Sequence, residues 1–417
     1  MKIMEIEGGK ELSGTIRISG AKNATVALIP AAILTDEEAT ICNIPEITDT
    51  DALCDILNEL NVNVKRASES IIINPKNMQN IEIKEEFSKK LRASYYFMGA
   101  LLGKYKKAVM YFPGGCSIGA RPIDLHLKGF EALGATVKSD KNKYIVEAKE
   151  LHGANIYLDI ASVGATINIM LAAVKAKGKT IIDNAAKEPE IVNVATFLNN
   201  MGAKITGAGT STIKIEGVDY LHQCFHEVIP DRIEAGTYII IGALCGNPLK
   251  IDNIIPEHLD SLLSKLEEMG VDLEIGQDYV LVSNQNNKKA TSIKTAVYPG
   301  FPTDLQQPFA VLQTQCNGKS KATETIWENR FMHIPYLRDL GADIVVKNQT
   351  ATIIGPTPLI GTSVVATDLR AGAAMVAAAL IATGKTTITN VEHILRGYEN
   401  IVEKLTNVGA KISIKEI

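Results

Sequence analysis

The sequence predicts an α/β protein made of six repeated units of about seventy residues each, and two periodic features support this prediction. A six-residue pattern, such as EMGVDL at 268–273, ends an amphipathic helix, such as the one at 257–270, and recurs at intervals of 68 to 73 residues. Its third residue falls at Asn61, Gly134, Gly202, Gly270, Gly341 and Gly409. Glycine there suits the left-handed conformation in which many helices end. A β-rich segment follows each copy, from SIIIN at 70–74 to KISIKEI at 411–417.

Each unit also has a second helix, which begins at a polar site. The starts, spaced 66 to 72 residues apart, are Lys22, Arg92, Ser162, Arg232, Asp304 and Arg370. These helices are strongly apolar, as in TINIMLAAV (166–174) and AAMVAAALIA (373–382). A solenoid whose units contact only their neighbours would show the same repetition. We favour two globular halves of three units each, because helices that are apolar all round need to be buried as bundles.

The composition is that of a globular protein with enough length for two domains. The chain has 417 residues, a hydrophobic fraction of 46% and a formal net charge of -4. This mild acidity argues against a general nucleic-acid or membrane-surface role. The first residues lack the apolar core of a signal peptide, and the apolar run at 371–384 is too short to span a bilayer. We therefore expect a cytoplasmic protein that does not bind membranes or nucleic acid, with its six cysteines reduced.

Arginine is scarce in this chain, which has 34 lysines and nine arginines. Such a bias keeps arginine mostly where a planar, forked cation is needed. Arg92, Arg232 and Arg370 lie at the starts of repeat helices, and Arg121 and Arg396 lie close to neighbouring helices. Helix N-termini favour anions, so the set predicts binding of phosphate and carboxylate groups. For any single arginine, a structural ion pair is an equally good interpretation.

Two further residues have both a structural and a chemical interpretation. Asp304, in PTDLQ, is either a helix cap or a general base held ionised by neighbouring cations. Cys116 lies in the glycine-rich stretch YFPGGCSIGARPID at 111–124. This stretch is either a plain strand-to-helix connector or a lid that carries an exposed thiol, with Arg121 favouring the thiolate. Local sequence leaves both pairs of alternatives open.

The sequence predicts neither a metal nor a redox cofactor. It contains no Walker loop, no nucleotide-type GxGxxG after a strand, no HExxH and no paired CxxC. His222, Cys224 and His226 in HQCFHE would share one face of a strand and could ligate a metal. We favour a polar strand face instead, since no further ligand stands nearby in the sequence.

A series of motifs along nearly the whole chain resembles one family. The motifs include GAKNA (20–24), LRAS (91–94), PGGCSIGARPIDLH (113–126), SVGAT (162–166), PDRIEAGT (230–237), FPTDLQ (301–306), ENRFMH (328–333), ATDLRA (366–371) and RGY (396–398). They are similar to those of the enolpyruvyl transferases that act on UDP-N-acetylglucosamine. The resemblance implies two inside-out, barrel-like α/β domains, each of three βαβαββ units with buried helices. It implies residues 22–229 as one domain, 1–21 with 230–417 as the other, and an active site in the cleft between them.

The resemblance also implies an activity, the first committed step of peptidoglycan synthesis. The enolpyruvyl group of phosphoenolpyruvate passes to the 3′-hydroxyl of UDP-N-acetylglucosamine, and phosphate leaves. We expect a monomer that acts on these two small molecules without a cofactor. The alternatives are 3-phosphoshikimate 1-carboxyvinyltransferase, which shares the fold, and a catalytically silent paralogue that binds sugar nucleotides. Cys116 and SVGAT favour the first reading over the shikimate enzyme, and the joint presence of Cys116, Lys22, Asp304 and Arg396 argues against the silent paralogue.

The resemblance implies roles for the residues of this sequence that match the family's motifs. Cys116 is the implied proton donor, able to form a covalent adduct with phosphoenolpyruvate, and Asp304 is the implied base for the sugar hydroxyl. The implied contacts to phosphoenolpyruvate are Lys22, Asn23, Arg121 and Arg396, of which Lys22 and Arg396 also count as catalytic. The implied contacts to the sugar nucleotide are Arg92, Arg121, Pro122, Ile123, Asp124, Leu125, Ser162, Val163, Gly164, Asp304 and Ile326. The implied supporting residues are Arg232, Arg330, Asp368 and Arg370.

Two positions depart from the family pattern. Thr48 and Ile160 stand where basic residues can occur in the family. Their difference bears on contacts to the nucleotide phosphates and leaves the chemistry unaffected.

We predict that Cys116→Ser abolishes the covalent adduct with the epoxide fosfomycin, which the family binds at this thiol, because a serine hydroxyl is not ionised at neutral pH. Mass spectrometry of the drug-treated protein checks this. The unchanged protein should carry one adduct on the peptide that contains Cys116. An adduct on Cys42 or Cys54 instead would contradict the assignment.

Overall fold

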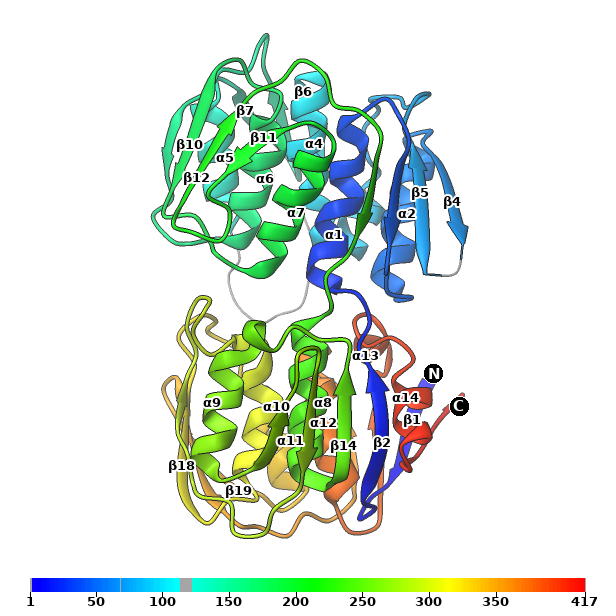
Figure 1. Ribbon diagram of the computed structural model, residues 1–417, viewed down its shortest axis with the longest axis vertical. Helices are drawn as coiled ribbons and strands as arrows, with labels where there is room; N and C mark the ends of the chain where they lie inside the picture. The colour runs from blue at the N-terminus through cyan, green and yellow to red at the C-terminus, as the bar shows by residue number, and fades with distance from the viewer. Residues whose placement is uncertain (1, 68, 113–121, 417) are drawn as a thin grey trace. The chain divides into compact units, whose positions relative to one another are not determined.

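The computed structural model describes residues 2–67, 69–112 and 122–416, which form two compact units (Figure 1). The discontinuous unit consists of residues 2–19 and 230–416, and the inserted unit of residues 20–112 and 122–229. The chain passes from one unit to the other at 19–20 and again at 229–230.

The inserted unit contains sheets whose strand orders are β13-β3-β5-β4, β6-β8-β7 and β11-β12-β10-β9. Their strands are β3 (Ala39–Cys42), β4 (Asn63–Ala67), β5 (Ser70–Asn74), β6 (Lys107–Tyr111), β7 (Thr136–Asp140), β8 (Lys143–Glu147), β9 (Asn155–Tyr157), β10 (Lys179–Asp183), β11 (Lys204–Thr206), β12 (Thr212–Glu216) and β13 (Cys224–Glu227). The helices are α1 (Lys22–Ala31), η1 (Ala32–Leu34), α2 (Thr48–Glu59), α3 (Glu85–Lys90), η2 (Arg92–Tyr95), α4 (Tyr96–Tyr105), α5 (Asp124–Ala132), α6 (Val163–Ala173) and α7 (Pro189–Asn200).

The discontinuous unit contains sheets whose strand orders are β15-β16-β14-β2, β17-β18-β20-β19 and β21-β22-β1-β23. Their strands are β1 (Lys2–Glu7), β2 (Leu12–Arg17), β14 (Gly246–Asp252), β15 (Asp272–Ile275), β16 (Tyr279–Ser283), β17 (Ile293–Lys294), β18 (Gly318–Thr323), β19 (Asp343–Lys347), β20 (Thr350–Gly355), β21 (Ser363–Val365), β22 (Lys385–Thr389) and β23 (Lys411–Glu416). The helices are α8 (Arg232–Cys245), η3 (Pro256–Leu259), α9 (Asp260–Met269), α10 (Thr303–Gln313), α11 (Ile334–Asp339), α12 (Leu369–Ile381), α13 (Glu392–Leu395) and α14 (Ile401–Asn407).

The sheets are variants of one plan, although β6-β8-β7 has no described parallel strand and β1 supplies the second antiparallel strand of the last sheet. A parallel strand, a buried helix, a central strand, an outer helix and an antiparallel pair follow one another, as in β17, α10, β18, α11, β19 and β20. The first repeat of each unit takes its parallel strand from elsewhere in the chain. β13 pairs with β3, and β2 pairs with β14. The predicted α/β class with repeated units is therefore confirmed, and the described strands form separate open sheets that do not close into barrels.

The apolar repeat helices form the core of each unit, as predicted. In the inserted unit α4 packs on α1 and α6, and in the discontinuous unit α10 packs on α8 and α12. Figure 1 shows these helices with sheets on their outer sides. The approach of α4 to α6 is close, since a Cβ on Gly99 would lie 2.3 Å from the carbonyl oxygen of Asn168. Among the described residues, no helix is both long enough and apolar enough to cross a lipid bilayer.

The repeat pattern reappears in the backbone. The residues at the ends of the amphipathic helices, Asn61, Gly134, Gly202, Gly270, Gly341 and Gly409, all have positive φ. The predicted left-handed ends are thus confirmed. A second series, which the sequence analysis did not detect, directly follows central strands. Asn43, Asn184, Asn253 and Asn390 occupy these positions with φ of 56°, 55°, 59° and 56°.

Candidate active site

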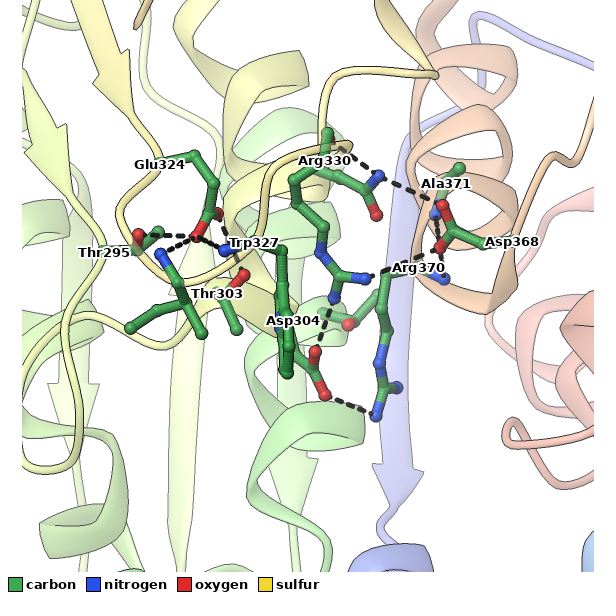
Figure 2. A network of polar contacts seen from close by, with 12 residues as sticks. Thr295, Thr303, Asp304, Glu324, Trp327, Arg330, Asp368, Arg370 and Ala371 are labelled. Atoms are coloured by element: carbon green, nitrogen blue, oxygen red, sulfur yellow. Dashed lines mark hydrogen bonds and ion pairs between the residues drawn. The ribbon is translucent and has the colours of Figure 1, made fainter. Parts of the chain in front are cut away.

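Asp304 is the centre of a charged cluster in the discontinuous unit (Figure 2). It lies in the first turn of α10, and its Oδ1 atom is 2.5 Å from a terminal nitrogen of Arg330. Its Oδ2 atom is 3.2 Å from a terminal nitrogen of Arg370, at the start of α12. Asp368 lies 4.0 Å from the other side of the Arg330 guanidinium. The structure thus brings together residues that are far apart in the sequence.

Burial gives this cluster its electrostatic character. The side chains of Arg330 and Arg370 are 3% and 4% exposed, whereas that of Asp304 is 28% exposed. Burial works to lower the pKa of Arg370, but the carboxylates of Asp304 and Asp231, with the hydrogen bond to Tyr398, raise it above its usual value. Buried cations of this kind are stable only when opposite charges pair with them. Asp304 is therefore a carboxylate paired with two fixed cations, and its side chain is more exposed than theirs.

Hydrogen bonds hold the arginines in place. A terminal nitrogen of Arg370 donates to the Tyr398 hydroxyl at 3.2 Å, and this hydroxyl is 2.9 Å from that of Thr237 on α8. The Gln307 amide donates to the backbone oxygen of Arg330 at 3.1 Å and to Asp368 at 3.3 Å. Sequence reasoning missed Gln307, whose only signal is its place one turn after Asp304.

The capping alternative for Asp304 does not hold. The residue before α10 is Pro302, and no side chain caps this helix among the described residues. Asp231 caps α8, Asp368 caps α12 and Ser162 caps α6. At these three starts some of the backbone N–H groups that favour anions are already occupied. The anion-binding capacity expected of the helix starts therefore depends more on arginine side chains than on backbone groups.

The remaining predicted residues of this unit lie in different settings. Arg232, the first residue of α8, has its guanidinium carbon 5.4 Å from the centre of the Tyr298 ring. Arg396 directly follows α13 and is half-buried. Ile326 lies in the loop after β18, where its backbone N–H donates to Glu324 at 2.8 Å.

In the inserted unit, Lys22 is part of a shielded ion pair. It is the first residue of α1, and its ammonium group lies 3.0 Å from the carboxylate of Asp49 on α2. The side chains are 14% and 4% exposed. Asn23 follows in the same helix and is half-buried. Asp49, which the sequence analysis missed, lies next to Thr48, one of the two positions that depart from the family pattern.

A buried histidine connects three predicted segments of the same unit. His126 on α5 contacts the ring of Tyr95 edge-on, with centroids 4.9 Å apart, and the guanidinium carbon of Arg92 is 6.0 Å from the centre of that ring. Asn168 on α6 donates to His126 Nδ1 at 2.9 Å and to the backbone oxygen of Tyr95 at 2.9 Å. Its side-chain oxygen accepts from the backbone N–H of Gly99. The buried cluster of Tyr95, His126 and Asn168 therefore lies next to three predicted segments, around Arg92, Pro122–Leu125 and Ser162–Gly164.

This network explains the glycine in SVGAT. A Cβ on Gly164 would lie 2.9 Å from the Tyr95 hydroxyl and 3.1 Å from Nε2 of His126. A side chain there would require Tyr95, His126 or the start of α6 to shift. Since Nδ1 of His126 accepts a hydrogen bond, its ring proton lies on Nε2, the atom that faces Gly164. Tyr95, His126 and Asn168 are thus structural partners that sequence reasoning did not select.

The predicted thiol, Cys116, and Arg121 lie outside the described residues. The described cysteines are Cys42, Cys54, Cys224, Cys245 and Cys316. Burial raises the pKa of each of these thiols, to about 11 for Cys224 and about 12 for Cys245 and Cys316. They are therefore weak nucleophiles near neutral pH.

The strand in the HQCFHE segment, β13, begins at Cys224, so His222 lies before it and does not share its face. His226 lies on β13, where Asn193 is 3.0 Å from Nε2 and Asn200 is 3.3 Å from Nδ1. Within the described ranges, no group of histidine, cysteine and acidic side chains could hold a metal ion. Ile160, the other position that departs from the family pattern, is 67% exposed.

Comparison with known proteins gives a consistent result. The profile of the family described as EPSP synthase (3-phosphoshikimate 1-carboxyvinyltransferase) matches residues 6–405. The chain is 55% identical over 412 residues to UDP-N-acetylglucosamine 1-carboxyvinyltransferase 2 of Geobacillus kaustophilus, covering 99% of this chain and 96% of that protein. It is 54% identical over 408 residues to the protein of the same name from Listeria monocytogenes, covering 98% and 96%.

Solved structures agree with the sequence relatives. The enolpyruvyl transferase NikO from Streptomyces tendae matches with a TM-score of 0.89 and 28% identity, covering 99% of both chains. EPSP synthase from Acinetobacter baumannii matches with a TM-score of 0.78 over 100% of both chains at 16% identity, which shows a shared fold.

We predict that His126 stays neutral from about pH 8 to about pH 5, because burial, together with the Arg92 charge, lowers its pKa to about 3. The unfolded chain takes up this proton first, so this group's contribution to stability is present above about pH 6.5 and is lost as the pH falls towards 3. NMR of histidine-labelled protein, with the signal assigned through His126→Gln, checks this. A His126 resonance that titrates near pH 6.5 would disprove the assignment.

Proposed function

Because this chain belongs to the EPSP synthase family of enolpyruvyl transferases, we propose that it transfers the enolpyruvyl group of phosphoenolpyruvate to the 3′-hydroxyl of UDP-N-acetylglucosamine. Near-full-length identity of 54% and 55% to proteins named for this activity supports the choice of sugar nucleotide over shikimate 3-phosphate. We also propose that the protein is cytoplasmic, that its product enters peptidoglycan synthesis, and that fosfomycin inhibits it.

The single observation that carries the chemistry is the Asp304 carboxylate between Arg330 and Arg370. The sugar hydroxyl must lose a proton as its oxygen attacks C2 of phosphoenolpyruvate, while C3 gains a proton. A carboxylate paired with fixed cations and partly exposed suits the role of the base. The same cations suit the negative charge of the phosphorylated, carboxylated substrate.

The reaction proceeds by addition and then elimination. Addition forms the C2–O3′ bond and a C3–H bond, which gives a tetrahedral intermediate that still carries phosphate. Elimination removes a proton from C3 and breaks the C2–O bond to phosphate, so that the vinyl ether and inorganic phosphate leave. We assign the proton donor role to Cys116, and the binding of phosphoenolpyruvate to Lys22, Asn23, Arg121 and Arg396. No metal or cofactor enters these steps.

The sugar nucleotide is assigned to the segments around the buried histidine network. Arg92, Pro122–Leu125 and Ser162–Gly164 supply the proposed contacts from the inserted unit. Ile326 and Asp304 supply them from the discontinuous unit. Arg232, Arg330, Asp368 and Arg370 act as supporting charges.

A phosphate-release assay with phosphoenolpyruvate and each acceptor tests the proposal. We expect phosphate and a vinyl ether product with UDP-N-acetylglucosamine. Release with shikimate 3-phosphate alone would support the shikimate enzyme, and release with neither acceptor would support a silent sugar-nucleotide binder. Both of these outcomes would contradict the proposal.

We further predict that Asp304→Asn retains sugar-nucleotide binding but lowers turnover by at least about a hundredfold, because an amide cannot accept the hydroxyl proton. Calorimetry measures binding, and phosphate release measures turnover. Asp260→Asn, the same substitution at an exposed position in the first turn of α9, is the matched control and should leave both unchanged. Lost binding with retained turnover would refute the role of base.

A further inference from the structure

Glu324 differs from the asparagines that occupy the same repeat position in four other repeats; Phe112, after β6, is the remaining residue of the series and also lacks a positive φ. Asn43, Asn184, Asn253 and Asn390 directly follow the central strands β3, β10, β14 and β22, each with positive φ. Glu324 follows the central strand β18 and does not share the left-handed backbone. The repeat position is the same, but the residue and its conformation differ.

The change of residue reverses the direction of the hydrogen bonds. The side-chain amides of Asn43, Asn184 and Asn253 donate to backbone oxygens of Val228, Leu158 and Ile18, which lie just beyond the parallel strands of their sheets. A carboxylate cannot donate in this way, since it only accepts. Glu324 accepts a hydrogen bond from the Thr295 hydroxyl at 2.9 Å, on the segment after β17.

Glu324 also accepts from its own loop. The backbone N–H groups of Ile326 and Trp327 donate to Oε1 of Glu324 at 2.8 Å and 3.2 Å. Its Oε2 atom accepts from the Thr303 hydroxyl at 2.9 Å. Glu324 is 1% exposed, so these donors replace water around a buried carboxylate. Figure 2 shows the carboxylate among these donors.

The loop 324–330 is therefore fixed to the first turn of α10 at both ends. At one end, Glu324 binds Thr303, the residue before Asp304. At the other end, Arg330 binds Asp304, and its backbone oxygen accepts from Gln307. The loop cannot shift without disturbing the orientation of Asp304, and the loop itself carries Ile326.

We infer that Glu324 is a positioning residue for sugar-nucleotide binding, holding the Ile326 backbone and the Asp304 turn in register. This inference rests on the proposed function, which assigns Ile326 and Asp304 to the sugar nucleotide. Glu324 is buried and both of its carboxylate oxygens accept hydrogen bonds from the protein, so we expect it to act through the loop and the α10 turn. Its loss should therefore weaken binding of the sugar nucleotide far more than binding of phosphoenolpyruvate.

The test compares Glu324→Ala and Glu324→Gln with a matched control, Asn253→Gly. The control removes the side-chain hydrogen bond at the same repeat position of the same unit, and glycine tolerates the positive φ there. For Glu324→Ala we expect the KM for UDP-N-acetylglucosamine to rise about tenfold, and that for phosphoenolpyruvate by less than about twofold. The KM of Glu324→Gln for UDP-N-acetylglucosamine should lie between those of the unchanged protein and Glu324→Ala, because the glutamine side chain still has an oxygen that can accept the hydrogen bonds made to Oε1. Asn253→Gly should leave both KM values unchanged.

A second readout does not depend on activity. Trp327 is the single tryptophan in the sequence, so the intrinsic fluorescence of the protein reports on this loop directly. Glu324→Ala should shift the emission maximum to the red, because the loop is released towards solvent, and Asn253→Gly should not. Thr303→Val removes one hydrogen bond to Glu324 and should raise the KM for the sugar nucleotide by a smaller factor. This variant tests the positioning role if Glu324→Ala does not fold.

The outcomes separate the two proposals. If the unchanged protein releases no phosphate with UDP-N-acetylglucosamine, the proposed function fails, and the fluorescence comparison still decides whether Glu324 holds the loop. If activity is present but Glu324→Ala and Thr303→Val leave the sugar-nucleotide KM unchanged, or raise both KM values equally, the positioning role is overturned. Unaltered emission of Glu324→Ala would overturn it as well.

Discussion

The burial of apolar helices in each unit decides where charged side chains can lie. Residues along α6, α8 and α12 are almost all inaccessible to solvent, so a charge in their middle would have no partner and no water. Polar groups are tolerated at the helix starts, where unpaired backbone N–H groups require them. Ser162, Asp231 and Asp368 meet this need as caps of α6, α8 and α12. Arg370 lies in the first turn of α12, and Asp304 lies in the first turn of α10. The need to pair these backbone N–H groups therefore places polar and charged side chains at the N-terminal end of each helix.

Charge compensation then shapes the cluster in the discontinuous unit. Two buried guanidinium groups, Arg330 and Arg370, face the carboxylates Asp304 and Asp368. Pairs of this kind do little for net stability, since the desolvation of each group offsets the attraction. Their value is orientation, because the cations are fixed before a substrate arrives and need no rearrangement when charge develops. Asp304 is the most exposed of the four, which fits the substrate contact that the proposed function assigns to it.

The repeated units place residues at equivalent positions, and different residues at these positions make different polar contacts. Comparable places after the central strands hold asparagines that tie a sheet to its parallel strand, and one holds Glu324, which instead ties a loop to α10. The starts of the repeat helices vary in the same way, from Lys22 to Asp304 to Arg370. A backbone used several times can thus keep its packing while its polar ends acquire different functions.

The sequence alone determined the α/β class, the repeated units, the left-handed helix ends and the buried apolar helices, because each depends on local periodicity and on glycine or asparagine at fixed intervals. It also selected Asp304 and Arg370 from their places at helix starts. Only the tertiary structure showed that Asp304 joins Arg330 and Arg370 and does not cap its helix, and that Asp49 pairs with Lys22. The partners His126 and Asn168, and the role of Glu324, were likewise hidden. Such pairings join residues from different repeats or from separate helices and loops, and their distances depend on how the helices pack in space, which no spacing along the chain records.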